Sequence, residues 1–146
     1  MPDKYFLDTN VFVYAFDASA PEKQRKAHTL IQGALSHHSG CTSSQVVQEF
    51  IHVATRKFAV PLKTTDCEQY LTTVLGPLCE VFTSLELYRR ALDIMEHWPY
   101  AFYDALIIAG ALQANCDVLC SEDLQDGQRI QGLTIRNPFS LPHNSP

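Results

Sequence analysis

Short apolar runs alternate along this chain with longer segments whose apolar residues recur at helical spacing. The runs predict strands at 4–7, 39–43, 79–82, 117–120 and 132–139. The longer segments predict helices at 20–38, 44–58, 64–75, 84–98 and 100–116, with a short helix or turn at 11–17. Strands that alternate with helices predict an α/β fold built on a mainly parallel central sheet.

Capping and helix-breaking residues support these boundaries. Pro21 lies where a helix start favours proline, and Ser43 or Ser44 can cap the helix that is predicted over 44–58. Gly76 and Pro77 are expected to close one helix, and Pro99 to stop another. Residues 100–116 are apolar on almost every face, which predicts a central, buried helix.

A length of 146 residues suits one domain with a substantial core. We expect a single domain over residues 1–139 and a disordered tail at 140–146, where the chain reads "SLPHNSP". With 46% hydrophobic and 18% charged residues, the composition is that of a globular protein. The sequence has no membrane-length apolar run and opens on charged residues, so we expect a cytoplasmic protein.

Cysteine and histidine spacing argues against zinc and against a disulfide framework. The five cysteines are odd in number and contain no Cys-x-x-Cys pair. None of the six histidines belongs to a His-x-x-x-His pair. We therefore expect the cysteines to pack in the core as small apolar side chains.

Four acidic residues stand where the predicted strands end or the following helices begin. They are Asp8, Glu49, Asp104 and Asp123. In a parallel sheet these positions meet at one edge, which is where such folds bind ligands. Successive members are 41, 55 and 19 residues apart, so only the tertiary fold could bring them together.

Each acid alone has a simpler interpretation. Asp8 and Asp123 could be turn residues, Asp104 could favour the positive end of its helix, and Glu49 could be a solvated helix residue. Together, however, four neighbouring carboxylates would repel one another unless a cation neutralised them. Carboxylates suit Mg²⁺ or Mn²⁺, and phosphodiester hydrolysis is the chemistry that fits such a site.

Four separated motifs resemble those of PIN-domain nucleases, in particular VapC-type toxins of toxin–antitoxin systems. They are "FLDTNV", "QEF", "FYDALIIAGAL" and "LCSEDLQDGQ" followed by "NPF", and the resemblance spans roughly residues 4–139. It implies a three-layer α/β/α sandwich and a Mg²⁺- or Mn²⁺-dependent endoribonuclease. It also implies a homodimer that a cognate antitoxin inhibits.

The resemblance assigns the site residue by residue. Asp8, Glu49, Asp104 and Asp123 become the catalytic acids and metal ligands. Polar support would come from Thr9, Asn10 and Ser121. Asp126 lies three residues past Asp123, where it could assist a metal or simply solubilise a turn.

The net charge of −5 opposes binding of an RNA backbone. Two divalent cations at the four acids would change this balance to −5 + 4 = −1. We therefore expect modest affinity for RNA.

Three other functions are consistent with the same sequence pattern. One is a stand-alone RNA-processing PIN nuclease, and another is a non-catalytic PIN-like binding module in which the acids serve as caps. The third is a Mg²⁺ phosphohydrolase of small molecules, although the first strand is followed by "DTN" and lacks the Asp-x-Asp pattern often seen there.

Overall fold

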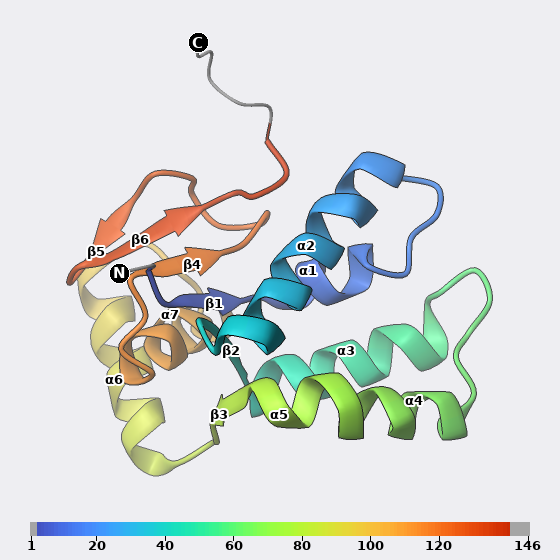
Figure 1. The fold of residues 1–146 in the computed structure, drawn as a ribbon. Coiled ribbons are helices and arrows are strands. Elements are labelled where there is room, and N and C mark those ends of the chain that lie inside the picture. Colours follow the sequence, from blue (N-terminus) through green and yellow to red (C-terminus); the bar gives the residue numbers. More distant parts are fainter. Residues whose placement is uncertain (1–2, 141–146) are drawn as a thin grey trace, which may run out of the picture.

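The computed structural model describes residues 3–140, which form a six-stranded sheet flanked by helices (Figure 1). The strands are β1 (Tyr5–Leu7), β2 (Gly40–Ser43), β3 (Cys79–Val81), β4 (Val118–Cys120), β5 (Arg129–Ile130) and β6 (Leu133–Arg136). Their order in the sheet is β3-β2-β1-β4-β6-β5, and every neighbouring pair is parallel except β5 with β6. The predicted α/β fold with a mainly parallel sheet is confirmed.

The helices occupy the segments between the strands. They are α1 (Thr9–Tyr14), α2 (Pro21–His37), α3 (Ser44–Arg56), α4 (Thr64–Tyr70), the π-helical turn η1 (Leu71–Leu75), α5 (Gly76–Leu78), α6 (Leu85–His97) and α7 (Phe102–Gln113). Ser43 and Ser84 cap α3 and α6 by accepting backbone N–H groups with their hydroxyls.

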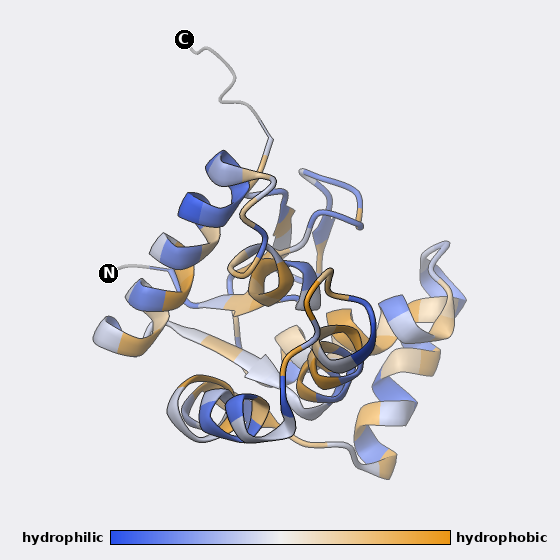
Figure 2. Cartoon of the chain, turned by 90° about the vertical axis from the view of Figure 1, so that its right-hand side faces the viewer, coloured by the Kyte–Doolittle hydropathy of each residue, from blue (hydrophilic) through white to orange (hydrophobic). Residues whose placement is uncertain are grey.

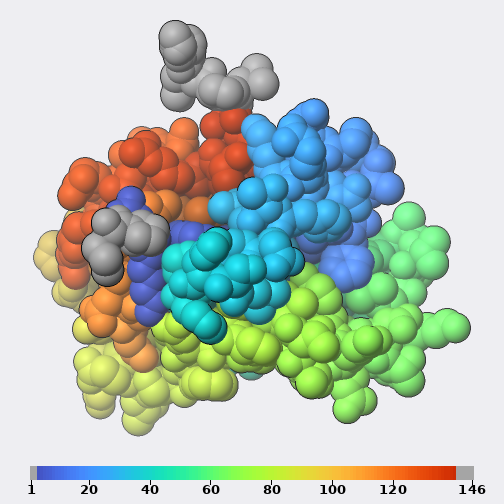
Figure 3. All heavy atoms as spheres, in the orientation of Figure 1, coloured from blue at the N-terminus to red at the C-terminus, as the bar shows by residue number. Residues whose placement is uncertain are grey.

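The core lies between the central strands and the helices that cover them. Phe6, Leu7 and Leu119 are fully buried, and every residue from Ala105 to Ala111 on α7 is buried. Hydrophobic residues gather on the inner sides of the elements, while hydrophilic residues lie on their outer turns (Figure 2). In the space-filling view α2 covers the middle of one face of the molecule (Figure 3). The prediction that 100–116 contains the central buried helix is confirmed.

The prediction that Gly76 and Pro77 end a helix is wrong. The helical path continues through the π-helical turn into α5, with Gly76 itself in the right-handed helical region. Its N–H donates to the carbonyl of Leu71, five residues earlier, and a Cβ at position 76 would lie 2.8 Å from that oxygen. Glycine therefore permits the wide turn, and Pro77 falls in the first turn of α5, where its missing N–H costs little.

Strand β5 was not predicted. It pairs antiparallel with β6 through a turn in which Gly132 has a positive φ of 91°. Two residues are too few to carry a period-two pattern, so its apolar signal is lost within the polar run that precedes it. The tail expected from 140 onward lies, from residue 141, outside the described residues.

The cysteines pack as expected. All five are free, and all but the half-buried Cys79 are buried. The closest pair joins β2 to the loop before β4, with the Sγ atoms of Cys41 and Cys116 3.4 Å apart. In the described part of the chain, no helix has the length and apolarity that a membrane crossing requires.

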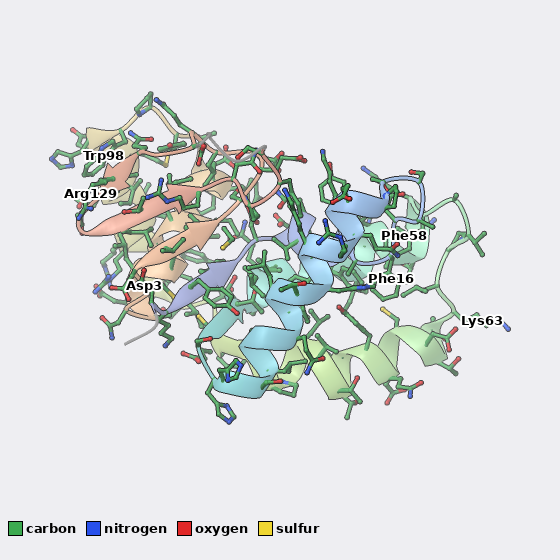
Figure 4. The ribbon with its side chains drawn as sticks, turned by 45° about the horizontal axis from the view of Figure 1, so that its top comes forward. Asp3, Phe16, Phe58, Lys63, Trp98 and Arg129 are labelled. Atoms are coloured by element: carbon green, nitrogen blue, oxygen red, sulfur yellow. The ribbon has the colours of Figure 1, made fainter. Side chains whose placement is uncertain are left out.

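An aromatic cluster fixes the end of α3 to α1 and α4. Phe16 lies 5.6 Å from Phe58 and 5.0 Å from Tyr70 between ring centroids. Figure 4 shows Phe16 and Phe58 beside each other, with Lys63 beyond them at the tip of this end. The cluster holds α3 in a fixed position against the first helix.

Two buried glycines should respond oppositely to replacement by alanine. A Cβ on Gly40 would lie 2.4 Å from the Cβ of Ala34 and 2.8 Å from the ring of Tyr5, whereas a Cβ on Gly110 would meet nothing closer than 3.7 Å. We expect Gly40→Ala to lower the free energy of unfolding by about 1–3 kcal/mol through overpacking. Gly110→Ala should raise it by about 0.5–1 kcal/mol through better helix propensity.

Urea denaturation of the two variants and the parent measures both effects. Equal stabilities for the Gly40 variant and the parent would contradict the close approach of α2 to β2.

Candidate active site

Asp8 lies directly after β1 and begins α1. Its Oδ1 accepts the N–H of Thr9 at 2.7 Å, and its Oδ2 accepts the hydroxyl of Ser121 at 2.8 Å. Only 7% of Asp8 is exposed. The carboxylate is therefore fixed on both sides in a nearly dry environment.

Strand pairing explains why Asp8 meets Ser121. Leu7 on β1 lies beside Cys120 on β4, and the N–H of Asp8 donates to the carbonyl of Cys120 at 3.1 Å. Because the two strands are parallel, the residue that follows each one emerges at the same edge of the sheet. The predicted supporting role of Ser121 next to Asp8 is consistent with this geometry.

Glu49 reaches the same place from α3. It is half-buried, and its Oε1 accepts the hydroxyl of Thr9 at 2.5 Å. Its Oε2 accepts the side-chain amide of Gln45, one turn earlier on the helix, at 3.2 Å. Thr9 therefore joins Glu49 to the segment that carries Asp8.

Asp123 and Asp104 form the exposed side of the site. Asp123 follows β4, and its Oδ2 accepts the side-chain amide of Asn10 at 3.2 Å. Its N–H donates to the hydroxyl of Ser121, also at 3.2 Å. Asp104 lies in the first turn of α7.

Electrostatics connects the four acids. The pKa of Asp8 is raised from 3.8 to about 6, chiefly by burial and to a smaller extent by the charges of Glu49 and Asp123, although its two hydrogen bonds act to lower it. Burial also raises the pKa of Asp104, followed by the charges of Asp123 and Glu49. The fold thus brings four carboxylates from distant segments within mutual electrostatic range.

The donor set fits a hard divalent cation that keeps part of its water shell. In the stretch from residue 3 to 140, no three acidic, histidine or cysteine side chains form a group that could hold a metal by themselves. Mg²⁺ commonly binds through one or two carboxylates and several waters. Two further oxygens, Asn10 Oδ1 and Gln45 Oε1, are buried without a hydrogen-bond partner, as groups that face an additional ligand would be.

Asp126 lies outside this cluster. Its Oδ1 accepts the N–H of Asn137 at 2.8 Å, which ties the loop after β4 to the segment after β6. This contact gives Asp126 a structural role in the turn.

Several residues that support the site were not predicted. Gln45 Nε2 also donates to the carbonyl of Tyr103 at 3.2 Å, so Gln45 joins Glu49 to the start of α7. Its position four residues before Glu49 on one helix face was a usable signal.

Glu122 anchors the loop that carries Asp123. Its carboxylate accepts the hydroxyl of Tyr14 and the ammonium of Lys23, each at 2.6 Å. Lys23 also lies over the ring of Tyr14. Since Lys23 and Glu122 are 99 residues apart, nothing in the local sequence indicated this contact.

The fold is shared with solved toxin–antitoxin structures. A toxin–antitoxin complex from Klebsiella pneumoniae matches with a TM-score of 0.68 at 18% identity, covering 94% of this chain and 100% of that chain. VapBC2 from Rickettsia felis, bound to a DNA fragment from its promoter, matches with a TM-score of 0.59 at 16% identity. The match covers 90% of this chain and 96% of that chain. VapC20 from Mycobacterium tuberculosis, a toxin that cleaves the sarcin–ricin loop, matches with a TM-score of 0.57 at 16% identity. The match covers 82% of this chain and 90% of that chain.

At these identities the likeness to solved structures concerns the fold. No curated protein matches the sequence significantly. The PIN domain family, in contrast, matches residues 5–129, which is most of the chain and includes all four acids. This chain belongs to the PIN domain family.

Proposed function

We propose that this protein is a Mg²⁺- or Mn²⁺-dependent endoribonuclease and the toxin of a toxin–antitoxin pair. The observation that carries the proposal is the gathering of Asp8, Glu49, Asp104 and Asp123 at the carboxyl edge of a parallel sheet. Membership of the PIN domain family supports nuclease chemistry. The similarity in fold to toxin–antitoxin complexes, and to a toxin that cleaves RNA, supports the biological role.

The burial of Asp8 is the physical argument for a cation. An ionised carboxylate in a dry environment, beside two further acids, destabilises the folded protein in the absence of positive charge. Buried ionisable groups that destabilise the folded protein in this way are typical of functional sites. We propose that Asp8, Glu49, Asp104 and Asp123 would hold the metal together with its bound waters.

When bound, a divalent cation would lower the pKa of water and stabilise negative charge on phosphate oxygens. The protein's own side chains and backbone hold the acids in position. Asp8 is fixed by Ser121 and the backbone of Thr9, Glu49 by Thr9 and Gln45, and Asp123 by Asn10. Glu49 or Asp123 could also accept a proton from the attacking water.

The proposal includes two partners besides RNA. A cognate antitoxin would silence the enzyme, and a second copy of the chain would form a homodimer in the cytoplasm.

Replacing one acid tests the proposed activity. We expect the purified protein to cleave RNA with Mg²⁺ or Mn²⁺ and to be inactive with a chelator. Asp104→Asn should lower the cleavage rate by roughly 10²-fold or more, because the acid is exposed at the site and its loss removes charge without disturbing the core. Gel analysis of labelled RNA fragments measures the rate.

Two matched substitutions serve as controls. Asp66→Asn makes the same change in the first turn of α4, and Asp126→Asn makes it in the turn outside the cluster. Both should retain activity. The nuclease proposal would be contradicted if RNA stayed intact with every metal tested, or if the Asp104 variant were as active as the parent. The non-catalytic binding module would then be the better explanation.

A second prediction concerns stability and pH. The folded-state pKa of Asp8 lies above the ordinary value, so the folded state binds the proton more tightly and stability falls as pH rises from 3.8 to about 6. At neutral pH without metal, Asp8→Asn should therefore increase the free energy of unfolding by an amount on the order of 2 kcal/mol. This gain in the free energy of unfolding should disappear as the pH falls from about 6 to 3.8.

Thermal melting in chelator, and again with Mn²⁺, measures this effect. Added Mn²⁺ should stabilise the parent and leave Asp8→Asn almost unchanged, with Asp66→Asn following the parent. A variant that gains no stability at neutral pH would contradict the electrostatic cost assigned to Asp8.

A further inference from the structure

Two cysteine side chains meet at the edge of the sheet opposite the acidic cluster. Cys41 is the second residue of β2, and Cys116 lies two residues before β4 begins. Their Sγ atoms are 3.4 Å apart, although the two residues are separated by 75 positions in the sequence. Both lie at the amino ends of parallel strands, whereas Asp8 and Asp123 follow the carboxyl ends. The pair is therefore remote from the proposed nuclease site.

Backbone pairing holds both cysteines in place. Cys41 lies beside Phe6 in the parallel ladder of β1 and β2. The N–H of Cys116 donates to the carbonyl of Ala111 at 3.0 Å, and the N–H of the residue after it donates to the carbonyl of Lys4 at 2.7 Å. A disulfide requires the sulfurs to approach to about 2.05 Å, which is a movement of roughly 0.7 Å for each sulfur from the present 3.4 Å. The fold thus brings the two thiols close to bonding distance.

A positive charge lies beside the pair. The ammonium of Lys4 donates to the carbonyl of Ala114 at 2.8 Å and forms an ion pair with Glu80 at 2.6 Å. The pKa of the Cys41 thiol is lowered, chiefly by its hydrogen bond with Cys116. The charge of Lys4 acts in the same direction, against burial and the charge of Glu80. Since the thiolate is the nucleophilic form of cysteine, Cys41 is the member of the pair that reacts first.

The other cysteines have a different environment. Burial raises the pKa of Cys67, Cys79 and Cys120, in the last case to about 12. Their thiols therefore resist ionisation. Cys41 combines a thiol that ionises more readily with a second thiol in contact, which is the arrangement of redox-sensitive cysteines. In a reducing compartment, disulfides between such pairs are transient and sense oxidants.

We propose that Cys41 and Cys116 are a site of oxidation, at which a peroxide forms an intramolecular disulfide that stabilises the folded chain. Burial selects the class of oxidant. The two residues are 0% and 6% exposed, so the oxidant has to be small enough to reach sulfurs beneath the surface. Hydrogen peroxide is close to water in size, whereas glutathione disulfide is far larger than the opening at Cys116.

The reaction takes place in two steps at the sulfurs. The Cys41 sulfur attacks one peroxide oxygen, the O–O bond breaks, and the released hydroxide takes up the Cys41 proton and leaves as water. The Cys116 sulfur then attacks the Cys41 sulfenic acid, the S–O bond breaks, and the hydroxide leaves with the Cys116 proton as a second water. Two thiols are oxidised, and one peroxide is reduced to two waters.

The position of the disulfide determines its effect. It would close a loop of 75 residues, which restricts the unfolded chain and so favours the folded state. It would also join β2, which leads into the helix with Glu49, to the loop after α7, the helix with Asp104. Because the disulfide forms at the amino edge of the sheet, the acids at the carboxyl edge keep their positions. Oxidation would therefore make the chain harder to unfold without rearranging the acidic cluster.

Mass spectrometry of the intact, fully reduced chain after treatment with hydrogen peroxide tests the proposal. The number of thiols that can be alkylated under denaturing conditions should fall from five to three. Cleavage before aspartate places Cys41, Cys116 and Cys120 in separate peptides, so the linked peptides should identify the first two. The oxidised chain should melt roughly 5–10 °C higher than the reduced chain, and dithiothreitol should reverse both changes.

Serine variants provide the controls. Cys41→Ser and Cys116→Ser should keep their four remaining thiols after peroxide and show no shift in melting temperature. Cys79→Ser, on the neighbouring strand β3, is the matched control and should fall from four thiols to two.

Four results would overturn the proposal: five thiols in the treated parent, oxygen retained on Cys41, a link to another cysteine, or an oxidised chain that melts no higher. The parent alone decides these points if a variant does not fold. None of the measurements involves RNA or metal, so the result is independent of the proposed nuclease activity.

Discussion

The pairing of β1 with β4 is the interaction on which the rest of the site depends. It places Asp8 beside Ser121, and it brings the loop with Asp123 to the edge where Asn10 can reach it. On the other side of β1, the parallel strand β2 leads directly into α3 and so delivers Glu49. A central strand of only three residues thus aligns three of the four acids.

The site is organised at the expense of stability. The fold buries Asp8, whose ionised form would be better solvated in water, and adds like charges around it. Hydrogen bonds from Ser121 and Thr9 offset part of that cost but not all of it, since the pKa remains raised. A chain selected for stability alone would have no reason to keep this arrangement, and that is the strongest physical indication that the acids have a function.

The two apolar sides of α6 illustrate the difference between core and surface. Leu87, Ala91 and Ile94 are buried within the chain, whereas Leu85, Tyr88, Leu92 and Met95 on the same helix are exposed. The hydrophobic pattern of a helix gives both sides the same signal. Only the position of α6 at the edge of the molecule separates them.

The sequence alone determined the elements and the identity of the candidate acids. Apolar runs and capping residues located the strands, the buried helix α7 and the start of α3, because local sterics and burial act over a few neighbouring residues. The same local signals misplaced the helix end at Gly76, where glycine permits a wide turn, and missed the two-residue β5, which is too short to carry a period-two pattern.

Tertiary structure alone decided what each acid touches. Thr9 with Glu49, Ser121 with Asp8 and Lys23 with Glu122 are contacts between residues 40, 113 and 99 positions apart. Asp126 has the same chemistry as Asp123, three residues earlier, yet it bonds to the backbone of Asn137. A carboxylate's sequence context specifies that it lies in a loop, but its partner depends on strand order and register, which are set by long-range pairing.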